Sequence, residues 1–165
     1  MSEYKAVIKW QRTSPDFLKG KYSREHTWSF DGGVTLPASA SPAVVPAPWS
    51  NPASVDPEEA FVASLSSCHM LTFLYLACKA GFQIDSYEDA AVGQVTKNKT
   101  GVPWVSLVTL NPRITYGGEK LPTPTDEERL HHLAHEQCYI ANSVKTEVVV
   151  GRDGVSPSLP TQSHL

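Results

Sequence analysis

Charged side chains are scarce in this sequence, and positive charge is not concentrated anywhere. Asp, Glu, Lys and Arg make up 19% of the 165 residues, and the formal net charge is −3. The largest basic cluster is only Lys97 and Lys99. Nucleic-acid-binding domains usually carry a basic face, and surface-bound membrane proteins carry polybasic segments. We therefore expect neither a nucleic acid nor a membrane as partner.

Cysteine is also scarce, with only Cys68, Cys78 and Cys138. The N-terminal segment MSEYKAVIKW has neither the apolar core nor the small-residue cleavage site of a signal peptide. These features predict a cytoplasmic protein, in whose reducing environment structural disulfides are uncommon. Paired cysteines in such a protein are more often catalytic or metal-bound than structural.

One uncharged run, residues 60–78, is about as long as a segment that spans a bilayer. It is interrupted by polar side chains at Ser64, Ser66, Ser67, His69 and Thr72. We therefore interpret the run as a buried core helix and not as a membrane span.

Local signals limit this helix to residues 57–80. Asp56 fits the N-cap, Pro57 the first helical position and Glu59 the reciprocal position of a capping box. Gly81 is typical of a residue that ends a helix. Apolar residues lie on nearly all sides of the helix, which indicates burial on all sides. In so short a chain, complete burial suggests that a second subunit contributes.

The remaining pattern is one of short strands with a second helix. Alternating residues and turn signals predict strands over residues 4–10, 22–30, 88–95, 103–116 and 143–150. A second helix is expected from Thr125, capped by Thr125 and Glu128, to Gln137 or Cys138. Strands at both ends of the chain with helices between them predict an α+β fold.

Proline is concentrated in one segment, since six of the 13 prolines fall within residues 36–57. Proline fixes φ and removes a backbone donor, so this segment is expected to be a loop. A loop of this length inside one domain is usually functional or disordered. The predicted organisation is a single domain over residues 1–150, which includes this Pro-rich loop, and a mobile tail over 151–165.

The three cysteines have different surroundings in the sequence. Cys68 follows a run of small residues and precedes His69, whereas Cys138 has polar neighbours on both sides. The neighbours of Cys78 are apolar and fit an inert core thiol. A free cysteine is more often a small buried hydrophobic residue than a nucleophile, so position alone favours structural roles for all three.

Two segments in combination resemble the OsmC/Ohr family, the osmotically inducible protein C and organic hydroperoxide resistance proteins. They are DPEEAFVASLSSCHMLTFLYLACKAG at 56–81 and CYIANSVKTEV at 138–148. A Pro-Glu run ten residues before one cysteine, with a second cysteine followed by Asn-Ser, is specific as a pair of signals. The resemblance implies an OsmC-like fold, in which N- and C-terminal antiparallel strands surround a long buried central helix, and an intertwined homodimer.

The resemblance also implies a function: a cysteine-based peroxidase that prefers organic hydroperoxides and acts in oxidative-stress defence. Cys68 matches the peroxidatic cysteine of the family and Cys138 the resolving cysteine. Glu58 matches its glutamate and Arg24 its arginine, with Arg12 as the alternative. The implied partners are the hydroperoxide, a dithiol reductant and a second copy of the chain, and no metal or organic cofactor is expected.

This chemistry needs these residue types. A thiolate attacks the O–O bond and is converted to a sulfenic acid. A second cysteine condenses with the sulfenic acid to a disulfide, which an external dithiol reduces. An arginine beside Cys68 would favour the thiolate and orient the peroxide, and a carboxylate would hold that arginine by a bidentate pair.

The spacing of Glu58 and Cys68 gives a separate inference. If both lie on one unbroken helix, ten residues separate them by about 15 Å. That distance is too long for both to contact one arginine. We therefore expect Glu58 to act in the site of the other subunit.

Two other functions are consistent with the residues. His131, His135 and Cys138 are spaced on one stripe of a helix, and with Cys68 or His69 they would supply four zinc ligands. Alternatively, the Pro-rich loop with Trp49 could cover a pocket for an apolar ligand in a protein that is not an enzyme.

Overall fold

The computed structural model of the chain describes residues 1–151. These residues form two compact units, Met1–Phe61 and a second unit that begins at Val62. Both helices and strands are present, which confirms the predicted α+β class. The single domain over residues 1–150 stays a prediction. Of the tail expected over 151–165, residues 152–165 lie outside the described residues.

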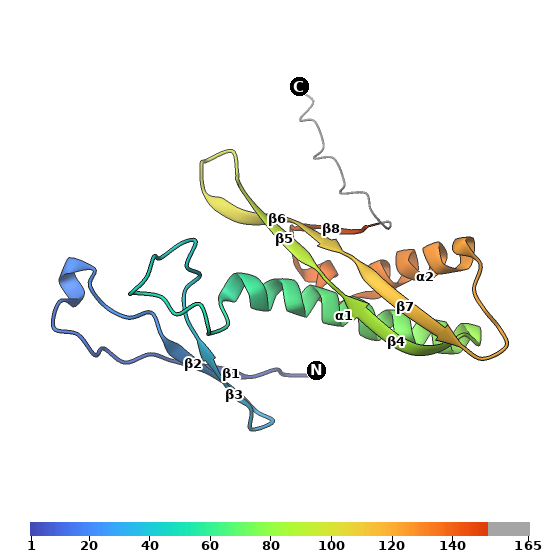
Figure 1. Ribbon diagram of the computed structural model, residues 1–165, viewed down its shortest axis with the longest axis horizontal. Coiled ribbons are helices and arrows are strands. Elements are labelled where there is room, and N and C mark those ends of the chain that lie inside the picture. The colour runs from blue at the N-terminus through green and yellow to red at the C-terminus, as the bar shows by residue number, and fades with distance from the viewer. Residues whose placement is uncertain (152–165) are drawn as a thin grey trace. The chain divides into compact units, whose positions relative to one another are not determined.

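The N-terminal unit contains a three-stranded antiparallel sheet in the order β1-β2-β3 (Figure 1). The strands are β1 (Ala6–Lys9), β2 (His26–Phe30) and β3 (Thr35–Ala38). In the register of the sheet, Trp28 lies between Ile8 and Leu36. The strand predicted over 22–30 begins only at His26, because the backbone N–H of Arg24 donates to the carbonyl of Trp49 instead. A short 3-10 helix, η1 (Phe17–Lys19), precedes β2.

The Pro-rich segment is an ordered loop after β3. Pro37 lies in β3, which is an edge strand and therefore tolerates the missing donor. The prediction of a loop over residues 36–57 is therefore wrong for residues 36–38, which belong to β3. The end of the loop returns to β3, since the backbone N–H of Val55 donates to the carbonyl of Pro37 and that of Ser39 to the carbonyl of Val55.

The long helix α1 (Pro57–Ala80) has the predicted limits. Asp56 Oδ1 accepts from the backbone N–H of Glu59 at 2.8 Å, and Glu59 Oε2 accepts from that of Asp56 at 3.2 Å. Both bonds of the predicted capping box therefore form. Gly81 ends the helix with a φ of 80°, a left-handed conformation that favours glycine.

Residues 1–151 bury one face of α1. Its buried residues are spaced by four and are Leu65, His69, Phe73 and Ala77. By length and composition alone α1 could cross a membrane, and 22% of its most apolar stretch is buried in this chain. Burial on all sides thus requires surfaces from outside the chain and stays a prediction.

The second unit has two sheets (Figure 1). β4 (Gln83–Asp89) pairs antiparallel with β7 (Pro112–Gly117). β5 (Val92–Lys97) pairs antiparallel with β6 (Pro103–Leu110), and β6 pairs parallel with β8 (Glu147–Val150). The expectation of antiparallel strands is therefore wrong for the last strand, β8.

The boundaries of these strands differ from the prediction, and the first of them begins at Gln83 and not at residue 88. The segments 88–95 and 103–116 each contain a break, at Ala90 and at Asn111, where the chain passes from one sheet to the other. The breaks lie together, since the backbone N–H of Asn111 donates to Asp89 Oδ1 at 2.6 Å. The last strand begins at 147 because a short 3-10 helix, η2 (Ala141–Ser143), precedes it.

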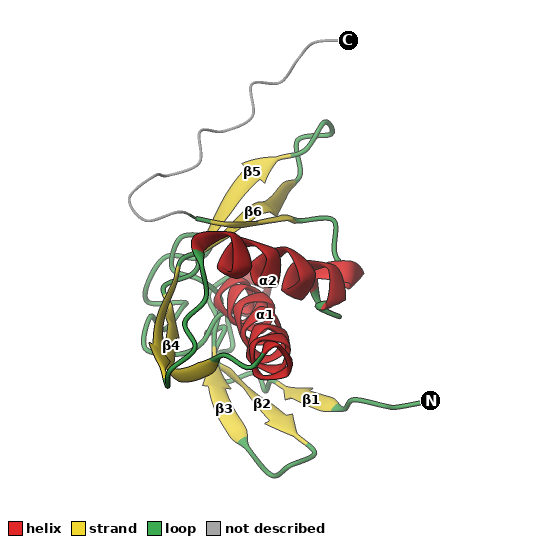
Figure 2. Cartoon of the chain, turned by 90° about the vertical axis from the view of Figure 1, so that its right-hand side faces the viewer, coloured by secondary structure: helices red, strands yellow, loops and turns green. Residues whose placement is uncertain are grey.

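The second helix, α2 (Pro124–Gln137), packs on α1 (Figure 2). Its N-cap is Thr123, which forms a capping box with Asp126, so the predicted pair of Thr125 and Glu128 is wrong. Pro124 fits the first helical position and fixes this frame. The core between the helices and β4 consists of Phe73, Ala77, Phe82, Leu130 and Ala134.

Candidate active site

The packing of α2 on α1 brings two cysteines together that are 70 residues apart in the sequence. Cys68 lies midway along α1, and Cys138 is the C-cap of α2. Both thiols are free, and they lie near enough to each other for Cys68 to raise the pKa of Cys138. Cys68 is partly exposed, whereas Cys138 is only 1% exposed. The contact gives a dithiol with one accessible and one sheltered sulfur.

The environment of Cys138 keeps its thiol protonated. Burial and, after it, the hydrogen bond with Cys68 raise the pKa of Cys138 to about 11. The backbone N–H of Ala141, 3.4 Å from Cys138 Sγ, opposes this rise and does not cancel it. At neutral pH Cys138 therefore keeps its proton. Cys68 is partly exposed and lines a surface groove, so it is the cysteine that a substrate can reach.

The residues after Cys138 fix its backbone. The side-chain amide of Asn142 donates to the carbonyls of Glu136 and Cys138, at 2.8 and 2.9 Å, and its backbone N–H donates to the Cys138 carbonyl at 3.0 Å. Ser143 Oγ donates to the Tyr139 carbonyl at 2.7 Å. The Asn-Ser pair of the sequence motif thus closes the end of α2 and holds Cys138 in place.

Cys68 opens on a surface groove of about 940 Å³. The groove is lined by α1, by the end of α2 and by the segment that follows α2, through Ser64, Ser67, Cys68, Leu71, Thr72, Tyr75, Glu136, Gln137, Tyr139 and Asn142. Leu71 and Tyr75 are the large apolar side chains that α1 exposes most, at 61% and 59%. A ligand in this groove would meet hydroxyl and amide groups beside the apolar surface of α1.

Beside the two thiols, two buried histidines join the same helices, a contact that the sequence did not reveal. His69 Nε2 and His131 Nδ1 are 3.0 Å apart, and the rings are stacked with centroids at 5.3 Å. Burial lowers the pKa of each imidazole to about 4; for His69 the positive charges of His131 and His135 add to this and Asp89 opposes it. The only sequence signal was that each histidine falls on the core stripe of its helix.

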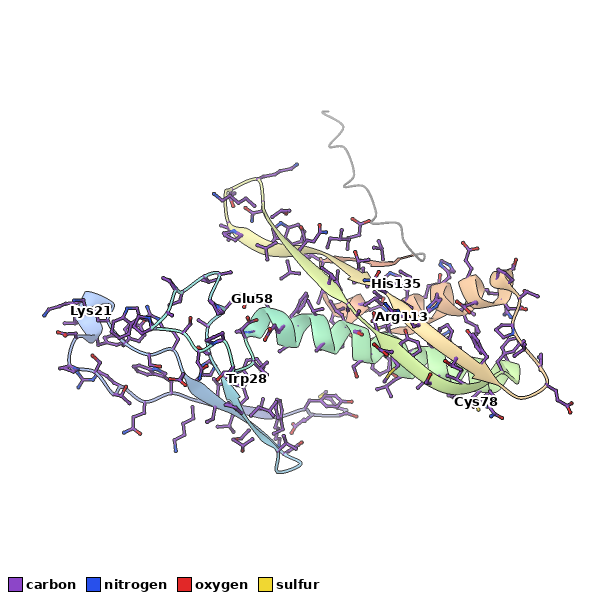
Figure 3. The ribbon with its side chains drawn as sticks, viewed as in Figure 1. Lys21, Trp28, Glu58, Cys78, Arg113 and His135 are labelled. Atoms are coloured by element: carbon purple, nitrogen blue, oxygen red, sulfur yellow. The ribbon has the colours of Figure 1, made fainter. Side chains whose placement is uncertain are left out.

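The other two predicted site residues, Arg24 and Glu58, belong to the N-terminal unit. Arg24 Nη1 donates to the carbonyls of Gly20 and Tyr22, at 3.1 and 2.5 Å, and its guanidinium lies 3.7 Å from the centre of the Tyr22 ring. Glu58 is in the first turn of α1 (Figure 3), and its Oε2 is buried without a hydrogen-bond partner among residues 1–151. Within those residues no ion pair joins Arg24 to Glu58.

Two sequence expectations fail here. Cys78 is exposed in the chain, near the end of α1 opposite to Glu58 (Figure 3), so it is not a core thiol. The zinc alternative is not supported, because residues 1–151 gather no three His, Cys, Asp or Glu side chains in a metal-binding arrangement. His131 is buried against His69, whereas His135 is exposed.

Comparison with known proteins gives one family and many similar structures. Residues 50–151 match the family model of the OsmC-like proteins. An OsmC-like protein of unknown function from Vibrio cholerae is 54% identical, with a TM-score of 0.89 over 92% of this chain and 99% of that one. This match confirms the OsmC-like fold. A search of the curated proteins found no match.

More distant structures share the fold. The organic hydroperoxide resistance protein of Elizabethkingia anophelis is 16% identical, with a TM-score of 0.67 over 93% of this chain and 98% of that one. An organic hydroperoxide resistance protein of Bacillus subtilis is 18% identical, with a TM-score of 0.61 over 90% and 95%.

Proposed function

Because the chain belongs to the OsmC-like family, we propose that it is a thiol-dependent peroxidase that reduces organic hydroperoxides to alcohols. The observation that carries this proposal is the contact between the thiols of Cys68 and Cys138. The names of the more distant structures, organic hydroperoxide resistance proteins, support the substrate class. The proposed setting is oxidative-stress defence in the cytoplasm.

The proposed reaction has three steps. The Cys68 thiolate attacks the terminal oxygen of the hydroperoxide, the O–O bond breaks, and the alcohol leaves with one proton. Cys138 then attacks the resulting sulfenic acid, which forms the Cys68–Cys138 disulfide and releases water. An external dithiol reduces this disulfide and is itself oxidised to a disulfide. The scheme uses no metal or organic cofactor.

The different burial of the two sulfurs supports this order of attack. The sulfur of Cys68 faces the groove, whereas Cys138 lies beneath the surface with a raised pKa. A hydroperoxide therefore meets Cys68 first. The proximity of Cys138 supports its proposed role, which is to condense with the sulfenic acid before a second peroxide oxidises Cys68 further.

Activation by Arg24 and Glu58 is the part of the proposal that involves a second subunit. α1 is unbroken from Pro57 to Ala80, so Glu58 and Cys68 are about 15 Å apart along its axis. The buried, unpaired Oε2 of Glu58 is a site that a guanidinium would satisfy. We propose a homodimer in which the exposed apolar face of α1 is covered and Glu58 orients Arg24 in the site of the other protomer.

The first experiment measures peroxide consumption by the purified protein with a dithiol reductant. Cumene or tert-butyl hydroperoxide should be consumed faster than hydrogen peroxide. Cys68→Ser should abolish turnover, Cys138→Ser should leave one turnover followed by over-oxidation of Cys68, and the matched control Cys78→Ser should match the wild type. The proposed function is refuted if Cys68→Ser still consumes peroxide, or if the wild type with reduced thiols consumes none.

The cross-subunit role of Glu58 has its own test. Cys68→Ser and Glu58→Gln are each expected to be nearly inactive when assayed alone. After the two proteins are mixed and allowed to exchange subunits, a mixed dimer combines the intact Cys68 of one protomer with the intact Glu58 of the other. Recovery of activity supports a shared site, whereas no recovery in demonstrated mixed dimers assigns Glu58 to its own chain.

A further inference from the structure

The two buried histidines lie beside the dithiol, on the same pair of helices. His69 follows Cys68 directly on α1, and His131 precedes Cys138 by seven residues, or about two turns, on α2. The His131 ring also contacts Phe73 of the core, with ring centroids 4.3 Å apart. The pair therefore links the apolar core between the helices to the position where the two thiols meet.

The burial of the pair assigns its protons. A neutral imidazole carries one N–H, so one nitrogen donates and the other accepts. His69 Nδ1 is buried with no partner among residues 1–151. A buried orphan N–H is rarer than an under-satisfied acceptor, so we assign the proton of His69 to Nε2, which donates to His131 Nδ1. The proton of His131 is then on Nε2, and this ring lines a surface pocket.

We propose that the His69–His131 hydrogen bond is a positioning contact that fixes the packing of α2 on α1 so that Cys68 and Cys138 can form a disulfide. The inference rests on the proposed resolving role of Cys138. Neither histidine is proposed to touch the hydroperoxide. Their effect is exerted through the helices that carry the sulfurs.

The physical reason is the difference between apolar packing and a hydrogen bond. A disulfide requires a Cα–Cα distance of about 4.4–6.8 Å and a narrow range of dihedral angles. Contacts among Phe73, Leu130 and Ala134 are non-directional and allow small shifts between the helices. A ring-to-ring hydrogen bond between buried partners weakens steeply with distance and angle. It is therefore a directional contact between α1 and α2 near the two thiols.

The test measures disulfide formation without any peroxide. The reduced protein is equilibrated in glutathione buffers, where oxidised glutathione accepts the two electrons and two protons of the Cys68 and Cys138 thiols. Thiol trapping and mass spectrometry give the equilibrium constant for the pair. Cys78→Ser serves as the background, so that only these two thiols react.

Three variants separate positioning from general stability. His69→Leu removes the hydrogen bond and should lower the equilibrium constant about tenfold, equivalent to about 1.4 kcal/mol. His69→Gln places an amide at the position of Nε2 and should retain most of the wild-type value. Leu130→Ala loosens the same helix–helix core but leaves the hydrogen bond between the histidines in place. Urea denaturation measures the free energy of unfolding of this variant and of His69→Leu, so that the two equilibrium constants are compared at known stability. If His69→Leu does not fold, His131→Phe keeps the stacked ring and removes the same bond.

The outcomes are distinct. The positioning contact is supported if the equilibrium constant for the disulfide falls in His69→Leu or His131→Phe but not in Leu130→Ala. The constant should also stay near the wild-type value in His69→Gln. The inference is overturned if the equilibrium constant falls equally in Leu130→Ala, or if it does not fall in the histidine variants. It is also overturned if the wild type forms no disulfide. A wild type that forms the disulfide but consumes no peroxide refutes the proposed function and leaves this inference standing.

Discussion

The buried pair of His69 and His131 predicts that the protein loses stability in mild acid. Burial lowers the pKa of both imidazoles from the ordinary value of 6.5 to about 4. Below pH 6.5 the unfolded chain binds protons at these two positions that the folded protein does not bind. Protonation therefore favours unfolding, and stability that is complete above pH 6.5 falls as the pH approaches 4.

The size of the effect follows from the two pKa values. Between pH 7 and pH 5, a shift from 6.5 to about 4 costs about 2 kcal/mol for each imidazole, or about 4 kcal/mol for the pair. Domains of this kind are stable by about 5–15 kcal/mol. The loss is therefore a large part of the total. Glu25 and Asp126, whose pKa values are lowered by hydrogen bonds, act mainly at still lower pH.

The assay is urea denaturation at pH 7, 6 and 5, followed by tryptophan fluorescence at one fixed protein concentration. The variant with His69→Gln and His131→Asn keeps polar atoms at the bonded positions and should show a much flatter dependence on pH. The control His132→Asn removes a histidine whose side chain is 71% exposed, and it should behave as the wild type. A wild-type loss below about 1 kcal/mol, or an equal loss in the double variant, would refute the reasoning.

Three further changes test the fold and the assembly. Thr123→Ala removes the observed N-cap of α2 and should cost about 1 kcal/mol in urea denaturation, whereas Thr125→Ala should cost little. Gly93→Ala would place a Cβ 2.5 Å from Val62 Cγ2 and should cost about 1–3 kcal/mol, partly recovered by adding Val62→Ala. Leu71→Asp puts a charge on the exposed apolar face of α1. If that face joins two subunits, sedimentation should show monomers of this variant. A dimer as stable as that of the wild type would contradict a role of this face in the dimer.

The limits of α1 were predictable because every signal for them is local. The capping residues lie within three positions of each other, and Gly81 follows the last helical residue. The start of α2 was misplaced because two overlapping segments, from Thr123 and from Thr125, both have a capping-box pattern. Only the frame with Pro124 at the first helical position forms.

The strands were harder to predict because their breaks depend on distant residues. No glycine or proline marks the break after Asp89, so the sequence pattern predicts one strand where the structure has two. The break there is stabilised by a bond between Asp89 and Asn111, which are 22 residues apart. A single sequence carries no signal for a contact of this range.

In the candidate site too, the features that depend on contacts between distant residues could not be predicted from the sequence. Composition and spacing favoured structural roles for Cys68 and Cys138, and only the family resemblance paired them. The bond between His69 and His131 joins residues 62 apart, whereas their spacing in the sequence indicates at most zinc ligands. What prevented the correct interpretation was the packing of α2 on α1, which decides that one histidine is buried while its neighbour His132 is exposed.

The exposed face of α1 connects assembly to chemistry. Leu71 and Tyr75, which α1 leaves exposed in the single chain, also line the groove that leads to Cys68. A protein surface that covers these side chains would also remove water from the groove and strengthen the electrostatic interactions of a thiolate within it. In the proposed homodimer, association would therefore complete the active site as well as bury apolar surface. Loss of activity on dilution should then parallel dissociation, because a single protomer leaves Cys68 on an open surface.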